Sequence, residues 1–254
     1  MTVVLYQFMV SHYCERSRWT LDFKQVPYHL VNWIPGPHIK QARGLGFNRS
    51  QVPILDYQGQ RMQGSDVVAR FLEERHPERP LWLDSEAGRA EINTWQKRID
   101  EEIGVPLRAL IYGDLMKHRN TVIDLWCQEK GLGSRMLCHL LYGTLKKKLV
   151  YYCRLAPEFR ADHVEKLARG LDELDEAYGE RAFLVGDRFT FADLSAAALA
   201  APLIMPSEHQ VNWPAKLPQS FEELRASHAQ RPTFQRVLEL YREFRLPTMA
   251  GKNA

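Results

Sequence analysis

Hydrophobic and polar positions in the first eighty residues follow two different spacings along the chain. Runs rich in β-branched and aromatic residues are typical of short strands, and they occur at 3–8, 28–32, 52–57 and 60–62. Apolar positions that recur every three or four residues indicate helices over 13–23, 38–43 and 65–75. This part of the chain is therefore predicted to alternate strands with helices, and then to form a hairpin and a last helix.

The ends of the predicted helices carry further signals. Ser11 and Ser65 are good N-cap residues for the first and third helices, and Pro27 ends the first. The two early strands can pair in parallel through a right-handed crossover, and the hairpin then adds an antiparallel edge. We expect the third helix to bury a face made of Val67, Val68, Phe71 and Leu72.

The remainder of the chain has little strand signal. Residues 77–84 contain two prolines and are typical of a domain linker. Thr190 and Asp193 have the spacing of a capping box before an apolar helix. We expect an α/β domain over 1–80 and an all-helical domain over 85–254. Helical patterns run over 86–112, 121–128, 134–152, 157–178, 191–203, 221–229 and 233–244.

The segment 134–152 carries an amphipathic stripe. We expect these side chains to pack in the core, with a partner or membrane surface as the alternative. The cationic run Lys146–Lys148 is expected to be a solvated helix face, with a membrane or RNA patch as its alternative. The stripe consists of Leu137, Leu140, Leu141, Leu145 and Leu149.

The composition of the chain argues against several classes of protein. The 254 residues carry a formal net charge of +3, far below the basic excess typical of a nucleic-acid-binding domain. The four cysteines form no Cys-x-x-Cys pair, and His139 beside Cys138 lacks the partners of a zinc site. We see no signal peptide and no apolar stretch long enough to span a membrane. A reduced, cytoplasmic compartment and no metal cofactor fit this pattern.

Candidate chemistry lies between the first strand and the first helix, at Ser11 and Cys14. A helix N-terminus presents unpaired N–H groups and the positive end of its dipole. A hydroxyl or thiol placed there can donate to an anion, or can itself become an anion with a lowered pKa. The alternative is that Ser11 is only a cap and Cys14 a small buried hydrophobe.

Two further segments suit an extended ligand. If the Val52-Pro53 bond is cis, the backbone of Val52 turns outward and can pair with a peptide; otherwise Pro53 marks an edge strand. Ser65 follows Gly64 at a predicted helix N-terminus. Such a position is a ready site for a carboxylate, or else an ordinary cap.

Taken together and in this order, these features resemble the cytosolic, bacterial-like type of the glutathione transferase superfamily, over about residues 3–110 and 157–245. The run 52–55 is similar to the cis-proline strand of that family, and 64–66 to its motif for the γ-glutamyl end of glutathione. Residues 183–193 are similar to its C-terminal folding motif. The resemblance implies a thioredoxin-like N-terminal domain, an all-helical C-terminal domain, a homodimer, and glutathione as co-substrate.

The resemblance also implies roles at matching positions. Ser11 would stabilise the glutathione thiolate, and Ser65 would bind the γ-glutamyl carboxylate. The backbone of Val52 would pair with the cysteinyl unit. The glycyl carboxylate would be reached by Gln51, or by Lys40 and Arg43. A small hydrophobic second substrate would lie between the domains, near Tyr13, Trp33, Ile103 and Tyr112.

The sequence departs from the family pattern at three places. Gly64 stands where the family usually has Glu or Gln, so one γ-glutamyl contact is missing or comes from elsewhere, with Gln63 as a candidate. Ser11 to Cys14 resembles a glutaredoxin-type site whose first Cys has become Ser. Residues 112–155 are additional, and they would shape a substrate pocket or a partner surface.

Three functions therefore stay open. The first is a glutathione-dependent transferase that joins the thiol to a small hydrophobic electrophile. The second is a binding or regulatory protein that kept the fold and lost the chemistry, which the change at Gly64 motivates. The third is a glutathione-dependent thiol transferase or reductase that uses Cys14.

Overall fold

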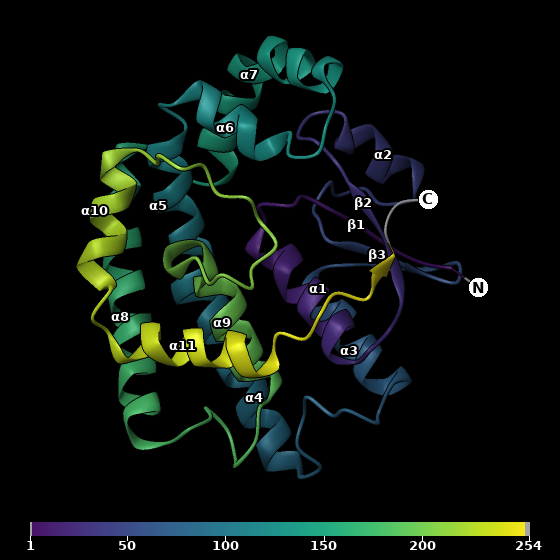
Figure 1. Cartoon of the computed structure of the whole chain (residues 1–254), viewed down its shortest axis with the longest axis vertical. Coiled ribbons are helices and arrows are strands. Elements are labelled where there is room, and N and C mark those ends of the chain that lie inside the picture. The colour runs from purple at the N-terminus through teal and green to yellow at the C-terminus, as the bar shows by residue number, and fades with distance from the viewer. Residues whose placement is uncertain (1, 252–254) are drawn as a thin grey trace.

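The strands of the first part of the chain form one mixed sheet with helices on both faces (Figure 1). The computed structural model describes residues 2–251. Leu5 and Leu55 point from the sheet toward α1 and α3, whereas Trp33 and Ile54 pack with α2 on the opposite face. The elements are β1 (Val3–Gln7), α1 (His12–Phe23), β2 (Tyr28–Asn32), α2 (His38–Gly44), β3 (Ile54–Tyr57), β4 (Gln60–Gln63) and α3 (Ser65–Arg75).

The strand pairing agrees with the predicted crossover and hairpin. β1 pairs with β2 in parallel, and β3 pairs antiparallel with both β1 and β4. The sheet also has a fifth strand, β5 (Ala250–Gly251), which comes from the other end of the chain and pairs in parallel with β2. This strand was not expected, because two residues are too few to show a strand period.

Three local predictions are wrong in detail. β3 begins at Ile54, after a cis Val52-Pro53 bond. The N-cap of α3 is Gly64, whose φ of 105° favours glycine, so Ser65 is the first helical residue and not the cap. Val67 is 45% exposed, because it lies on the solvent side of α3 and not on the buried face.

The second part of the chain is helical. Its first helical pattern was predicted to be continuous over 86–112, but a π-helical turn, η1 (Asp100–Gly104), separates α4 from α5. The elements are α4 (Glu86–Ile99), η1, α5 (Val105–Leu115), α6 (Arg119–Trp126), α7 (Leu132–Tyr152), η2 (Pro157–Phe159), α8 (Arg160–Glu180), α9 (Phe191–Ile204), α10 (Gln219–His228) and α11 (Pro232–Phe244).

Helix α9 is the centre of the helical part. All of its residues are buried, and it packs against α1, α4 and α11. The predicted capping box at its start is confirmed: the backbone N–H of Thr190 donates to the Asp193 carboxylate at 3.0 Å. The same carboxylate accepts from the N–H of Leu184 at 2.8 Å, so the cap also fixes the preceding loop.

Buried ion pairs attach the C-terminal segment to α1. Arg245, which follows α11, binds Glu15 at 2.8 Å and Asp22 at 2.7 Å. Glu15 also binds Arg18 at 2.7 Å. Burial alone would raise the pKa of Glu15, but the charges of Arg245 and Arg18 outweigh it and lower that pKa to about 2. This network positions the chain just before β5.

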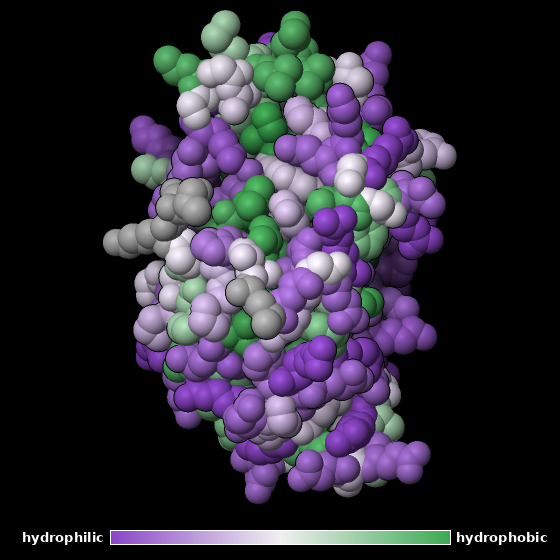
Figure 2. Space-filling view, turned by 90° about the vertical axis from the view of Figure 1, so that its right-hand side faces the viewer, coloured by the Kyte–Doolittle hydropathy of each residue, from purple (hydrophilic) through white to green (hydrophobic). Residues whose placement is uncertain are grey.

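Helix α7 lies at the periphery, at the top of Figure 1. The predicted core packing of its leucine stripe is right for Leu141, Leu145 and Leu149, and the first two approach the loop at Gly36. It is wrong for Leu137 and Leu140, which are exposed together with Leu132 and Met136. Figure 2 shows hydrophobic side chains gathered at this end of the molecule. Within residues 2–251, no helix has the length and apolarity required to cross a bilayer.

Candidate functional site

Ser11 caps the N-terminus of α1. The backbone N–H of Cys14 donates to Ser11 Oγ at 3.4 Å, and the backbone N–H of Ser11 donates to the carbonyl of Phe8 at 3.1 Å. In this cap the Ser11 hydroxyl accepts a hydrogen bond through a lone pair, so the hydroxyl proton remains available to a ligand. Ser11 is half-buried and therefore reachable. A hydrogen-bond donor thus lies at the positive end of the α1 dipole.

Cys14 lies one turn further along α1 and is fully buried. Burial raises the pKa of its thiol, although the Ser11 hydroxyl and the charge of Arg18 oppose the shift. Because the thiolate is the reactive form of cysteine, this environment favours the reading of Cys14 as a small buried hydrophobe.

The hydroxyl of Ser65 is part of a polar cluster that joins the two halves of the chain. Arg16 donates to Ser65 Oγ through Nε at 3.0 Å and Nη2 at 2.8 Å. The Nη1 of Arg16 binds the carboxylate of Asp100 at 2.8 Å, and Gln96 donates to the same carboxylate. Arg16 is only 1% exposed, whereas the Asp100 side chain is 25% exposed. The cluster therefore offers a cation, a hydroxyl and an anion side by side.

Sequence reasoning missed the role of Arg16, Asp100 and Gln96 in this cluster. Arg16 was seen as part of the segment after Ser11, but nothing in its spacing indicates that it reaches Ser65, 49 positions away. Asp100 lies in the π-helical turn, 84 positions from Arg16, and has no motif around it. The side chains of this cluster meet only when α1, α3 and α4 have packed together.

The segment before β3 presents free backbone. Neither the N–H nor the C=O of Val52 is hydrogen-bonded within residues 2–251. Gln63, the predicted replacement for a γ-glutamyl contact, instead holds this segment: its Nε2 donates to the carbonyls of Arg49 and Gln51 at 2.9 and 2.8 Å. The carbonyl of Pro53 accepts from the N–H of Gly64 at 3.0 Å. The strand edge and the start of α3 are thereby held together.

The residues predicted for the glycyl carboxylate lie on the surface. Lys40 and Arg43 are exposed on α2, and Gln51 is exposed before the cis bond. In the part of the chain that the structure describes, the side chains of these three residues make no hydrogen bond, so each remains available to an anion.

The residues predicted for a second substrate are only partly brought together. Tyr13 is half-buried beside Ser11, and Tyr112 is half-buried on α5, where it accepts from the indole of Trp126 at 3.5 Å. Ile103 is 1% exposed and faces α8, close to Gly170. Trp33 packs with Ala42 and Ile54 in the cluster under α2. Ile103 and Trp33 are therefore core residues and do not line the space beside Tyr13.

The side chains of Tyr13 and His12 are uncharged at pH 7, and they lie near the positive charges of Arg16 and Arg108. Burial raises the pKa of Tyr13 to about 12. His12 packs against it with ring centroids 4.6 Å apart, and burial lowers the pKa of His12 well below its ordinary value, helped by Arg108 and Arg16. His12 is therefore neutral at pH 7.

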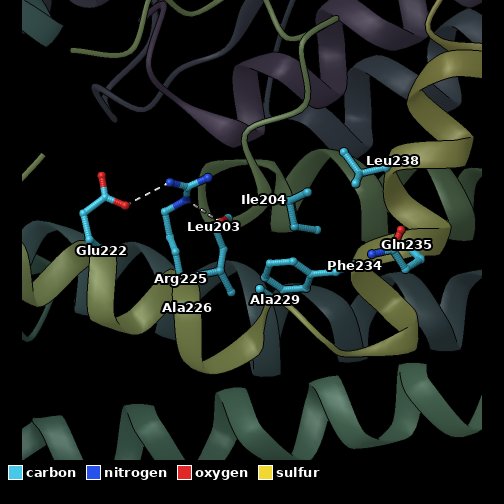
Figure 3. Close-up of a pocket in the computed structure, with 9 residues that line it drawn as sticks. All are labelled: Leu203, Ile204, Glu222, Arg225, Ala226, Ala229, Phe234, Gln235 and Leu238. Atoms are coloured by element: carbon cyan, nitrogen blue, oxygen red, sulfur yellow. Dashed lines mark hydrogen bonds and ion pairs between the residues drawn. The ribbon is translucent and has the colours of Figure 1, made fainter. Parts of the chain in front are cut away.

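Two surface cavities lie elsewhere. One, of about 330 Å³, lies between the end of α9, α10 and α11, where Figure 3 shows Arg225 reaching toward Glu222, away from Phe234. The other, of about 360 Å³, is lined by Asp114, Arg160 and His163. Neither includes a predicted site residue. Within residues 2–251, no three His, Cys, Asp or Glu side chains are grouped so that they could hold a metal ion.

Comparison with protein families decides the assignment. The family model for the N-terminal domain of glutathione S-transferase matches residues 5–80. The model for the C-terminal domain of the same family matches residues 157–221. The chain belongs to the glutathione transferase superfamily. The predicted architecture, a thioredoxin-like domain followed by a helical glutathione transferase domain, is confirmed.

Solved structures, among them two glutathione transferases, have the same fold. The β-etherase LigF from Sphingobium sp. strain SYK-6 matches with a TM-score of 0.62 and 20% identity, covering 94% of this chain and 99% of its own. A glutathione S-transferase from Methylobacterium radiotolerans, solved with glutathione sulfonate, has a TM-score of 0.56 and 19% identity over 100% of both chains. Glutathione transferase GSTFuA3 from Phanerochaete chrysosporium has a TM-score of 0.63 and 14% identity, covering 96% and 97%. No curated protein matches the sequence.

Proposed function

We propose that this glutathione transferase relative binds glutathione along the edge of its sheet and joins the thiol to a small hydrophobic electrophile. The observation that carries the proposal is the cluster of Arg16, Ser65 and Asp100 at the start of α3. The γ-glutamyl end of glutathione carries both an ammonium and a carboxylate. The exposed edge of Asp100 suits the ammonium, whereas Ser65 and Arg16 suit the carboxylate.

This cluster accounts for the change at Gly64. A side chain at Gly64 would be strained by its φ of 105°, so the polar contact usual at that position has to come from elsewhere. Asp100 supplies it from the helical part of the chain. The N–H and C=O of Val52, which have no partner in the described part of the chain, then suit pairing with the cysteinyl unit as an added strand.

In this arrangement the sulfur points to the N-terminus of α1. The Ser11 hydroxyl donates to the thiolate, and the helix dipole favours the negative charge, so the thiol pKa falls. The thiolate attacks an electrophilic carbon, a C–S bond forms, the bond to the leaving group breaks with its electron pair, and the thiol proton passes to solvent. Two neighbours of this fold were solved with glutathione or glutathione sulfonate bound, which supports glutathione as the ligand.

The test is conjugation of glutathione to 1-chloro-2,4-dinitrobenzene. Ser11→Ala is expected to lower kcat/KM by about 10²-fold, since one donor to a developing charge is removed. Ser11→Thr keeps a hydroxyl and should retain most activity, and Ser207→Ala, on an exposed serine, is the matched control. Full activity of Ser11→Ala would contradict the role of Ser11.

Calorimetry separates the proposal from a silent binding protein. Heat of glutathione binding without any turnover would support a binding or regulatory role. No heat at millimolar glutathione would overturn the glutathione site itself. A role for Cys14 as the reacting thiol would require glutathione to be trapped on it, and the burial of Cys14 speaks against that outcome.

The wider setting is part of the same proposal. We place the protein in the cytoplasm as a homodimer, with the glutathione site in 1–80 and the helical domain in 85–254. All four cysteines are free thiols, which suits a reducing compartment. The additional segment 112–155 includes α6 and α7, and α7 approaches the loop at Gly36, where it would shape the second-substrate site.

A further inference from the structure

One face of α5 and the turn before it lies opposite the start of α1. Gly104, Arg108 and Tyr112 recur every four residues and therefore share this face. A Cβ at Gly104 would meet the Tyr13 hydroxyl at 2.7 Å, so the two elements approach closely here. One turn further, the Arg108 guanidinium carbon lies 5.8 Å from the centroid of the Tyr13 ring. Arg108 thus faces the proposed second-substrate side of the site.

Arg108 differs from the fully buried arginines of this protein. Arg16, Arg18 and Arg245 each have a carboxylate partner within 2.8 Å. Within residues 2–251, Arg108 has no ion-pair partner, and its Nε is buried without any hydrogen bond. A buried donor that lacks a partner is costly and rare in folded proteins, so this one calls for an explanation.

The groups around Arg108 do not neutralise it. His12 and Tyr13 face it from α1, Tyr112 from its own helix and Cys153 from the end of α7, and Arg16 adds a second cation on the Tyr13 ring. Burial, and then the positive charge of Arg108, lower the pKa of His12, so that ring stays uncharged. None of these neighbours carries a negative charge at pH 7. The carboxylate of Asp100, which acts on Tyr13, is already bound by Arg16.

We propose that Arg108 is the anion-binding residue of the second-substrate site, and that the preferred electrophile carries a carboxylate beside its apolar body. This inference rests on the proposed transferase function. The planar guanidinium matches a carboxylate with two parallel hydrogen bonds, and the half-buried position strengthens such a pair. Tyr13 and Tyr112 provide flat apolar surface on either side for an aromatic body.

The test uses two substrates of the same shape. 4-Chloro-3,5-dinitrobenzoate and its carboxamide both lose chloride when the thiolate attacks the carbon that bears it, and they differ by one negative charge. Rates are divided by the uncatalysed reaction with glutathione. We expect kcat/KM to favour the carboxylate at least tenfold in the natural protein. Arg108→Gln should abolish the preference, because KM rises for the carboxylate and much less for the carboxamide.

Two controls distinguish a direct contact between Arg108 and the substrate carboxylate from a general effect of the positive charge of the protein. Arg242→Gln makes the same charge change at an exposed position of α11 and should leave the preference unchanged. Arg108→Lys keeps the charge without the planar fork, so an intermediate preference is expected. An equal loss on both substrates in Arg108→Gln would overturn the proposal, because Arg108 would then serve the sulfur or the fold.

A binding measurement keeps the inference testable without turnover. Calorimetry with 3,5-dinitrobenzoate and 3,5-dinitrobenzamide, in the presence of glutathione, compares unreactive forms of the same pair. Tighter binding of the benzoate that disappears in Arg108→Gln supports the inference. Equal binding of the two probes to the natural protein overturns it. If the benzoate preference holds but neither chlorinated substrate is conjugated, the transferase proposal fails and the anion site remains.

Discussion

The guanidinium of Arg16 lies 2.8 Å from the carboxylate of Asp100, and the two residues come from different halves of the chain. Arg16 belongs to α1 beside the sheet, and Asp100 to the turn that separates α4 from α5. The same guanidinium holds the Ser65 hydroxyl. The proposed glutathione site is therefore completed by the helical domain, and the sheet alone would offer only part of it.

The contribution of Asp100 can be measured directly. Asp100→Asn keeps the size of the side chain and removes the charge proposed to bind the γ-glutamyl ammonium. We expect glutathione to bind about tenfold or more weakly, since a charge-assisted hydrogen bond is lost. Calorimetry gives the dissociation constant, and Asp124→Asn, on the exposed face of α6, is the control. Unchanged affinity in Asp100→Asn would remove this residue from the site.

The buried network at Arg245 should be important for stability. Arg245→Met leaves Glu15 and Asp22 buried with one partner fewer, which costs about 3–5 kcal/mol for a broken buried pair. Unfolding in urea, followed by circular dichroism, measures the change. Arg242→Met is exposed and should change stability by less than about 0.5 kcal/mol. Similar midpoints for the two variants would show that the network is energetically neutral.

The capping box of α9 predicts a smaller effect. Thr190→Ala removes the hydroxyl that takes part in the cap and that donates to Asp193 at 2.8 Å. A loss of about 1 kcal/mol is expected. Thr94→Ala, at an exposed position inside α4, should be neutral or slightly stabilising, because Ala has the higher helix propensity. Equal effects of the two substitutions would argue against the cap.

The protein should become less stable as the pH is lowered, because buried histidines then become protonated. Burial lowers the pKa of His209 to about 4, below its unfolded value of about 6.5. The unfolded chain then binds the proton more readily, so the stability that His209 contributes is complete above pH 6.5 and is lost as pH falls toward 4. Glu15, with a pKa of about 2, stays charged throughout this window.

His209→Asn isolates this contribution. Its side-chain oxygen can replace Nδ1 of His209, which accepts from the N–H of Val211 at 3.2 Å. His12 and His38, whose pKa values burial also lowers, remain in both proteins. Melting temperatures from pH 7.5 to 4 should therefore fall less steeply in the variant. Parallel curves would mean that His209 does not govern the acid loss.

Patterns between near neighbours determined most of the fold. Runs rich in β-branched and aromatic residues over 3–8 and 28–32 predicted two strands, and the spacing of Thr190 and Asp193 predicted a cap that the structure confirms. These features depend on residues within one or two turns, where backbone geometry limits the choices. Ser11 was found in the same way, as a cap at the start of α1.

Only tertiary structure decided which distant side chains meet. No spacing could place Asp100 beside Arg16, leave Arg108 without a carboxylate partner among the described residues, move Trp33 into the cluster under α2, or bring Ala250 beside Tyr28. Such contacts form between residues up to hundreds of positions apart, and they depend on how whole helices pack. The sequence by itself determined the elements and the candidate serines; packing determined the charges that surround them.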